Sequence, residues 1–191
     1  MLYDVDWILS NCDDEQISSS FRYLREKYNI GTQYEWFALL AKKYGYKLET
    51  GVVHQYHGKV EDAIEAEGVL SLIPDDFLPG RYQVLPGENG DEIFTVFENL
   101  ILPIIKLSKK DEERIATENG WLDIMKLSWF CYNPDRHGEP CGWCGPCDDA
   151  MHTGMEWRLP KKAQWRNKHR AIYMFMYNTK RRLIQMTSAK R

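Results

Sequence analysis

Apolar residues recur every three or four positions in several stretches of the chain, a spacing typical of amphipathic helices. Residues 18–28 carry one such stripe, and Asn29-Ile30-Gly31 after it favours a helix end. Thr32, with Glu35 three residues later, predicts a capping box that opens a second helix before Gly45. The first quarter of the chain is therefore expected to be largely helical.

The remaining pattern alternates between helix and strand signals. Ser108 and Asp111 predict a capping box and a helix to Glu118, ended by Asn119-Gly120. Shorter helices are expected over 59–67 and 91–99, strand-like runs over 2–9 and 46–53, and apolar runs over 100–105 and 127–132. A segment rich in Pro and Gly from 74 to 90 predicts a long loop. This alternation favours an α/β fold.

Length and composition narrow the class of protein. The chain has 191 residues, of which 43% are hydrophobic and 28% charged, as expected for a globular domain with a small appendage. No apolar run reaches the roughly 18 residues of a membrane span, and the first residues lack a basic stretch that leads into a hydrophobic one. A soluble cytoplasmic protein without a membrane partner is expected.

The formal net charge of -3 hides a strong asymmetry. Residues 157–191 contain eleven Lys or Arg and no Asp or Glu, whereas the preceding residues contain 14 basic and 28 acidic side chains. Two interpretations stay open, a polyanion-binding arm over 158–191 and a helix that packs on the acidic body. Trp165, Tyr173, Phe175 and Tyr177 suit base stacking. Ile172, Phe175, Met176 and Leu183 also form one apolar helix stripe, so core packing is the favoured interpretation.

The chemistry of the chain is concentrated in four clustered cysteines. Cys131, Cys141, Cys144 and Cys147 have spacings that allow four thiolates to surround one zinc ion, and Gly142 permits the tight turn that such a knuckle needs. A structural zinc ion is the favoured interpretation, since clustered thiols do not resemble a secreted disulfide framework. An iron–sulfur cluster and free or redox-active thiols are the alternatives.

A redox alternative follows from residues 143–147, Trp-Cys-Gly-Pro-Cys, which match the thioredoxin active-site string. That fold needs a strand before the motif and most of its sheet after it, which the basic, helix-like remainder does not supply. A thiol oxidoreductase is therefore the third choice. The histidines at 137, 152, 54 and 57 are not expected to be ligands, and Cys12 is expected to be a buried structural residue.

Three segments of the chain resemble one enzyme family. Residues 103–112, 120–134 and 140–147, which include the four cysteines, resemble the C-terminal part of 7-cyano-7-deazaguanine synthases of the queuosine pathway. The resemblance implies a partial adenine-nucleotide-hydrolase-like sheet with flanking helices, an aromatic-rich strand that ends in Cys131, and a structural zinc knuckle followed by a helix. Leu78-Pro79-Gly80-Arg81 is similar to the family's turn near the nucleotide site, which makes Arg81 the candidate for a nucleotide phosphate.

The family belongs to the ATP-pyrophosphatase superfamily, so the resemblance also implies an ATP-dependent ligase. With ATP and Mg²⁺ it would convert a carboxylate on a deazapurine to a nitrile, through adenylation of the carboxylate and addition of ammonia. The superfamily's Ser-Gly-Gly-x-Asp-Ser phosphate loop is absent from the sequence, and Ser18-Ser19-Ser20 lacks the glycines that let backbone N–H groups reach a phosphate. Two explanations stay open: the protein lacks ATP chemistry, or the chain is the C-terminal portion of a longer protein.

Three regions and several partners are predicted. An α/β core is expected over 1–128, a zinc-knuckle region over 129–160, and a basic helical tail packed on the core over 161–191. A nucleotide or deazapurine is the expected small-molecule partner. The alternative function is a zinc-stabilised module that binds nucleic acid or protein through the tail, and a second copy or another chain is a further candidate partner.

Overall fold

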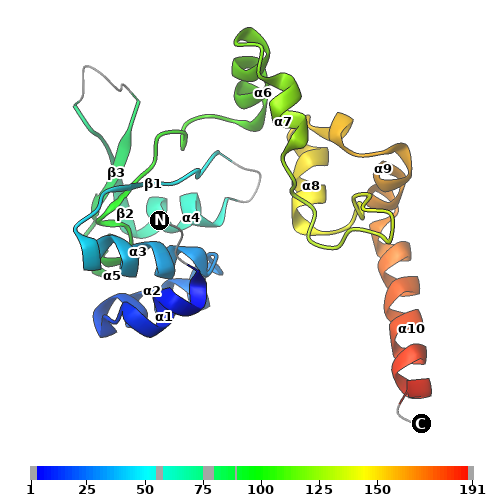
Figure 1. The fold of residues 1–191 in the computed structure, drawn as a ribbon, viewed down its shortest axis with the longest axis horizontal. Helices are drawn as coiled ribbons and strands as arrows, with labels where there is room; N and C mark the ends of the chain where they lie inside the picture. Colours follow the sequence, from blue (N-terminus) through cyan, green and yellow to red (C-terminus); the bar gives the residue numbers. More distant parts are fainter. Residues whose placement is uncertain (1–3, 55–57, 75–79, 89, 189–191) are drawn as a thin grey trace. The chain divides into compact units, whose positions relative to one another are not determined.

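The computed structural model describes residues 4–54, 58–74, 80–88 and 90–188. The chain forms two compact units, Met1–Leu107 and Ser108–Arg191. Figure 1 colours the ribbon by residue number, from blue at the N-terminus to red at the C-terminus. The boundary between the units lies after residue 107, whereas the sequence predicted an α/β core up to residue 128. Met125 and Phe130 pack against the cysteine cluster and so belong to the second unit. The mixture of helices and short strands confirms the α/β class at the coarse level.

The N-terminal unit begins with three helices. Helix α1 spans Val5–Asn11, where the carboxylate of Asp4 caps the helix by accepting from the Trp7 backbone N–H at 2.7 Å. The prediction of a strand over 2–9 is therefore wrong for the described residues, because this cap outweighs a weak alternation. Helix α2, Glu15–Tyr28, ends at Asn29 in the left-handed conformation, as its end signal predicted. Helix α3, Gln33–Tyr44, is present, but the Thr32 side chain makes no capping hydrogen bond.

The strands of this unit form two small sheets. Strand β1, Leu48–Glu49, pairs in parallel with β4, Leu100–Ile101, and this is the one parallel pair among the described residues. Strand β2, Gly68–Leu72, pairs antiparallel with β3, Tyr82–Pro86, and Tyr82 bridges to Leu102. The prediction of a loop from 74 to 90 is therefore wrong at 82–86, where strand pairing overrides the Pro and Gly signals. An extended parallel sheet is not seen in the described part of the chain.

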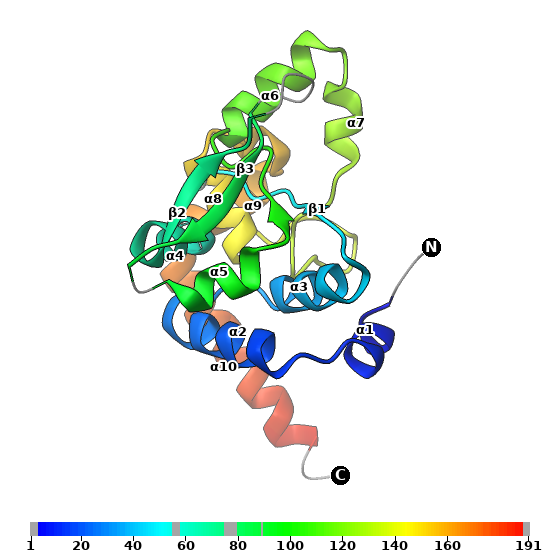
Figure 2. The same cartoon turned by 90° about the vertical axis from the view of Figure 1, so that its left-hand side faces the viewer.

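Helices cover these strands and enclose the core of the unit. Helix α4, Lys59–Glu67, has the predicted bounds, and α5, Asp91–Phe97, ends two residues before the predicted 99. Helices α2, α3 and α5 lie on one side of the strands in both views (Figures 1 and 2). The largest fully buried side chains of this core are Phe97, Ile17, Leu24, Ile30, Ile93, Leu100, Leu102, Val84 and Val96.

One buried carboxylate ties α4 to α2. The Oε1 atom of Glu67 accepts hydrogen bonds from the hydroxyls of Tyr23 at 2.8 Å and Tyr28 at 2.9 Å, and from Nζ of Lys27 at 2.7 Å. Burial acts to raise the pKa of Glu67, but these three donors together hold it below the usual 4.5. The same contact with Glu67 raises the pKa of Lys27 above its usual 10.5.

Replacing Glu67 with glutamine should therefore destabilise the N-terminal unit in a pH-dependent way. A lowered carboxyl pKa stabilises the fold above the unfolded-state value near 4.5 and loses this effect as the pH falls through the folded value. The raised pKa of Lys27 acts in the opposite direction, so its contribution is lost only above 10.5. Denaturant unfolding near neutral pH and in acid checks this expectation. An equal difference between Glu67→Gln and the unaltered protein at both pH values would contradict it.

The C-terminal unit is helical. Helices α6, Lys109–Glu118, and α7, Leu122–Leu127, precede the cysteine loop, α8 spans Gly145–His152, and a 3₁₀ turn covers Glu156–Arg158. The predicted capping box of α6 is confirmed, since Asp111 N–H donates to Ser108 Oγ at 3.2 Å and Ser108 N–H donates to Asp111 Oδ2 at 2.9 Å. Helix α7 covers 122–127 and residues 128–130 have no regular structure, so the strand expected before Cys131 is wrong.

Two basic helices end the described chain. Helix α9 spans Lys161–Lys168 and α10 spans Arg170–Ser188. Ile172, Phe175 and Met176 are all exposed within the described chain, and the side chain of Leu183 lies outside the described residues. Packing of the tail on residues 1–128 stays a prediction. None of the helices in the described ranges is both long and apolar enough to cross a membrane.

Candidate metal centre

The four clustered cysteines converge on one point of the C-terminal unit. Cys131 follows the irregular segment after α7, Cys141 lies in the loop, Cys144 is the N-cap residue of α8, and Cys147 lies in the first turn of that helix. All four side chains are buried. The start of α8 thus brings together cysteines that are separated along the loop. Pro146 lies in the first turn of this helix, where the backbone N–H that proline lacks would have no partner within the helix.

The distances between the sulfurs fit a tetrahedral ion. The ligand atoms all lie within 4.8 Å of one another. The Sγ atom of Cys144 lies 3.4 Å from that of Cys147 and 3.9 Å from that of Cys131, and the Cys141 and Cys147 sulfurs are 3.9 Å apart. Zinc–sulfur bonds of about 2.3 Å place the corners of a tetrahedron about 3.8 Å apart. Four thiolates with this spacing fit zinc, and the residues would hold it as a closed structural site.

Backbone N–H groups donate to the sulfurs of Cys131 and Cys141. The N–H of Cys141 donates to Cys131 Sγ at 3.2 Å, and the N–H groups of Trp143 and Cys144 donate to Cys141 Sγ at 3.4 and 3.3 Å. Hydrogen bonds of this kind favour the charged form of the acceptor. The loop is therefore arranged to stabilise thiolates, the form of cysteine that binds metal.

The thiols differ in acidity because their surroundings differ. Burial raises the pKa of Cys141 to about 11 and also raises that of Cys147. Burial acts in the same direction on Cys144, but hydrogen bonds from the backbone of Tyr132 and Cys147 and from neighbouring thiols hold its pKa below the usual 9.0. Metal binding must displace the thiol protons, so acid is expected to weaken it.

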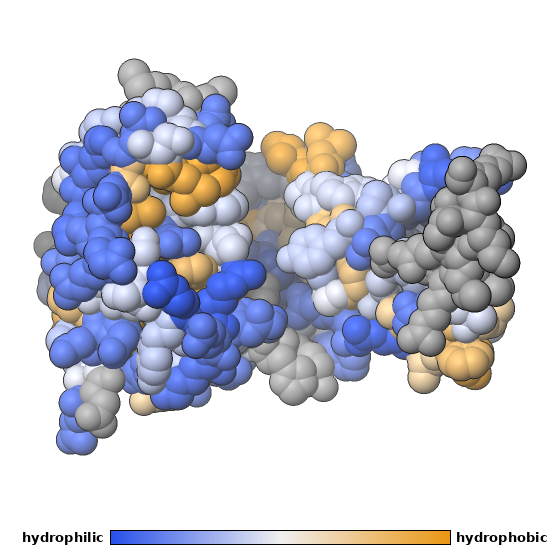
Figure 3. All heavy atoms as spheres, turned by 90° about the horizontal axis from the view of Figure 1, so that it is seen from below, coloured by the Kyte–Doolittle hydropathy of each residue, from blue (hydrophilic) through white to orange (hydrophobic). Residues whose placement is uncertain are grey.

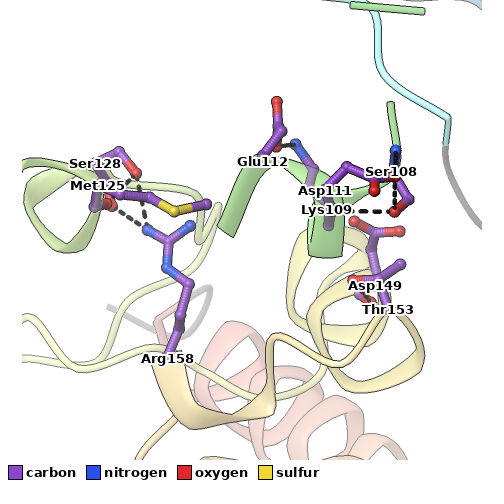
Figure 4. Close-up of polar contacts among 9 residues, drawn as sticks. All are labelled: Ser108, Lys109, Asp111, Glu112, Met125, Ser128, Asp149, Thr153 and Arg158. Atoms are coloured by element: carbon purple, nitrogen blue, oxygen red, sulfur yellow. Dashed lines mark hydrogen bonds and ion pairs between the residues drawn. The ribbon is translucent and has the colours of Figure 1, made fainter. Parts of the chain in front are cut away.

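A second set of contacts holds the loop from outside. The buried Arg166 of α9 donates from Nη1 to the carbonyl oxygen of Cys141 at 3.2 Å, and Trp143 packs on Tyr177 of α10 with ring centroids 5.0 Å apart. Arg158 donates from Nη2 to the backbone oxygen of Ser128 at 2.5 Å (Figure 4). The Cζ atom of its guanidinium lies 4.6 Å from the ring centroid of Phe130. The sequence did not reveal the roles of these two arginines. They lie in a strongly basic segment, where a single arginine resembles an ordinary solvent-exposed charge.

Residues 95–154 match the family model described as the queuosine biosynthesis protein QueC. The match contains all four cysteines and the capping box of α6. No curated protein and no solved structure matches the chain. The match supports the resemblance drawn from the sequence over this segment.

The remaining candidate residues lie apart from the centre. In the part of the chain that the structure describes, the cluster able to hold a metal consists of the four cysteines alone. His152 Nδ1 lies 2.8 Å from the carbonyl oxygen of Asp148, and His137 Nε2 lies 3.0 Å from Nε of Arg136. His54 pairs with Glu61, whereas His57 lies outside the described residues.

Two further sequence predictions concern residues of the N-terminal unit, Arg81 and Cys12. Arg81, the candidate for a nucleotide phosphate, forms an ion pair with Glu49 at 2.8 Å. Its role at a nucleotide stays a prediction. Cys12 is buried, as predicted for a structural cysteine.

The thioredoxin-like string does open a helix, since Cys144 caps α8. However, residues 128–143 contain no strand, and between α8 and residue 188 the regular elements are the 3₁₀ turn and helices α9 and α10. The two additional sulfurs lie within the same cluster as the pair from the string. The geometry therefore favours a four-sulfur metal site over a dithiol exchange site.

Gly142 provides a sharp test of the loop geometry. Its φ is +84°, and a Cβ atom there would lie 2.1 Å from the carbonyl oxygen of Ala163, in the α9 backbone. Replacing Gly142 with alanine should therefore destabilise the C-terminal unit by more than about 2 kcal/mol, through strain and displacement of α9. Thermal unfolding of the zinc-loaded protein measures the effect.

Gly145, the first residue of α8, is the matched control. An added Cβ meets nothing within 4 Å there, so Gly145→Ala should change the stability little. Equal melting temperatures for the two variants would contradict the described path of the loop.

Proposed function

We propose that this chain is a zinc-stabilised protein related to the queuosine-pathway synthases and acts on a deazapurine-like substrate with ATP and Mg²⁺. The observation that carries the proposal is that the family match over residues 95–154 coincides with the buried four-sulfur centre. Zinc supplies no step of the reaction in this proposal. Its chemical role is to crosslink the cysteine loop with the start of α8, a segment with little hydrophobic core of its own.

The centre supports function by fixing the position of neighbouring elements. Arg166 and Trp143 connect the loop with α9 and α10, while Arg158 connects the 3₁₀ turn with the end of α7. A zinc ion that orders the loop therefore also helps to position the helices that contact it, α9 and α10. Nucleotide binding is the first part of the proposal to test, because the sequence lacks the Ser-Gly-Gly-x-Asp-Ser loop.

Calorimetric titration of the zinc-loaded chain with Mg-ATP is the direct experiment. Heat of binding, followed by formation of AMP that requires 7-carboxy-7-deazaguanine and ammonia, is the expected result. Absence of heat at millimolar nucleotide would overturn the enzymatic proposal for this chain.

A matched pair of variants tests the role proposed for Arg81. Arg81→Ala removes the guanidinium, and Glu49→Ala removes its ion-pair partner but keeps the positive charge. If Arg81 contacts a phosphate, only Arg81→Ala weakens nucleotide binding. Equal effects of the two changes would instead assign the pair to the structure of the N-terminal unit.

A further inference from the structure

The two C-terminal helices expose a mixed aromatic and cationic surface. Trp165 of α9 is 57% exposed and Phe175 of α10 is 74% exposed, and both belong to a segment, 157–191, with eleven Lys or Arg and no acidic residue. Ile172 and Met176 are exposed beside them. In Figure 3, orange apolar side chains of the C-terminal unit reach the surface next to blue polar ones. Exposed apolar side chains that lie together, unlike single ones, commonly mark an interaction site.

The residues of α9 divide between two faces. Ala163 and Arg166 are buried toward the cysteine loop, where Arg166 bonds to the Cys141 carbonyl. Lys161, Trp165 and Lys168 follow one another at intervals of four and three residues and are all exposed. This spacing places the indole between two ammonium groups on one outer face of the helix.

The indole is also held in a fixed orientation. The ring of Trp165 stacks on that of His169, with centroids 4.5 Å apart and planes inclined by 26°. Tyr173 and Tyr177 of α10 turn instead toward Trp143 and so belong to the support of the cysteine loop. The exposed rings are thus distinct from those that stabilise the metal centre.

We propose that the exposed face of α9 and the first half of α10 binds single-stranded nucleic acid. This face is defined by Lys161, Trp165, Lys168, His169, Ile172, Phe175 and Met176. Stacking of bases on aromatic rings combined with cations that follow the phosphates is the physical basis of such binding. A single strand fits better than a duplex, because only unstacked bases present their faces to an indole.

The charge of this face and the order of its residues favour a nucleic acid over a membrane or a second copy of the chain. An interfacial membrane helix separates its apolar face from its charged one, whereas Trp165 here lies between Lys161 and Lys168 on one face. A second copy of the same face would oppose like charges across the contact. A polyanion, in contrast, neutralises the positive charges of this face. The proposal rests on residues other than the metal centre and is independent of the enzymatic proposal.

Fluorescence anisotropy with a labelled oligo(dT) of about 12 nucleotides tests the proposal on the zinc-loaded full chain. We expect binding whose affinity falls steeply between about 50 and about 200 mM salt, with a logarithmic slope near −0.7 for each phosphate contacted. Trp165→Ala should weaken binding roughly 5- to 100-fold, the loss expected for one base–aromatic stack. The double change Lys161→Glu and Lys168→Glu should weaken binding and flatten the slope.

Trp121→Ala is the matched control, because Trp121 is 53% exposed in the same unit but outside the basic segment. It should leave the affinity unchanged, and unaltered zinc content shows that each variant keeps its fold. Lack of binding at low salt, or equal losses from Trp121→Ala and Trp165→Ala, would overturn the proposal. Binding to phosphatidylserine vesicles without binding to the oligonucleotide, or self-association that protects Trp165, would overturn it in favour of a membrane or a second copy.

Discussion

Replacement of Cys147 with serine is expected to abolish stoichiometric zinc binding and to unfold the C-terminal unit. The side chain of Cys147 is fully buried and its sulfur lies 3.4 Å from that of Cys144 and 3.9 Å from that of Cys141. Structural zinc sites contribute about 10 to 16 kcal/mol of binding free energy, more than the whole stability of a typical domain. Elemental analysis of the purified protein measures the metal, and circular dichroism measures the lost helix.

Cys12 provides the matched control, since it is also buried but lies in the N-terminal unit. Cys12→Ser should keep one zinc ion per chain. A chelator added to the unaltered protein should reproduce the effect of Cys147→Ser. Stoichiometric zinc in Cys147→Ser, or a chelated protein with unchanged helix content, would contradict the structural role of the metal.

Replacement of Phe97 with alanine should destabilise the N-terminal unit by about 3 to 5 kcal/mol. Phe97 has no exposed surface, and its ring packs on that of Tyr34 with centroids 5.3 Å apart. The change would leave a cavity where α5 meets α3, in addition to the loss of buried apolar area. Denaturant unfolding followed by circular dichroism measures the effect, while the zinc content should stay unchanged.

Leu72→Ala serves as the control for Phe97→Ala, because Leu72 lies in β2 with 55% of its surface exposed. Its effect should stay within about 0.5 kcal/mol. A loss from Phe97→Ala as small as this would show that the core does not close around α5 as described.

Local signals predicted the start of one helix and the end of another. The capping box at Ser108 and Asp111 identified the start of α6, and the left-handed Asn29 identified the end of α2. These succeed because a cap or a helix end is decided by residues within a few positions of one another. The clustering of four cysteines was predictable for a related reason, since a short loop limits how far their sulfurs can separate.

Non-local contacts account for what the sequence did not reveal. Strand β3 lies in a segment punctuated by Pro79 and Pro86, and it forms because β2 supplies its hydrogen bonds. Arg158 and Arg166 look like ordinary surface charges until the fold brings them to Ser128 and to Cys141. Conversely, Phe175 has the helical spacing of a core residue and is exposed. Periodicity shows which residues share a face, but not whether anything covers that face.

The sulfur-only composition of the metal centre has a consequence for metal competition. Thiolates are soft donors that hold zinc strongly and have little affinity for magnesium, which prefers oxygen. The four ligands are all cysteine sulfurs, and no carboxylate shares the cluster in the described part of the chain. Excess magnesium, as supplied in any nucleotide titration, will therefore leave the zinc in place. The two ions act on this protein as separate reagents.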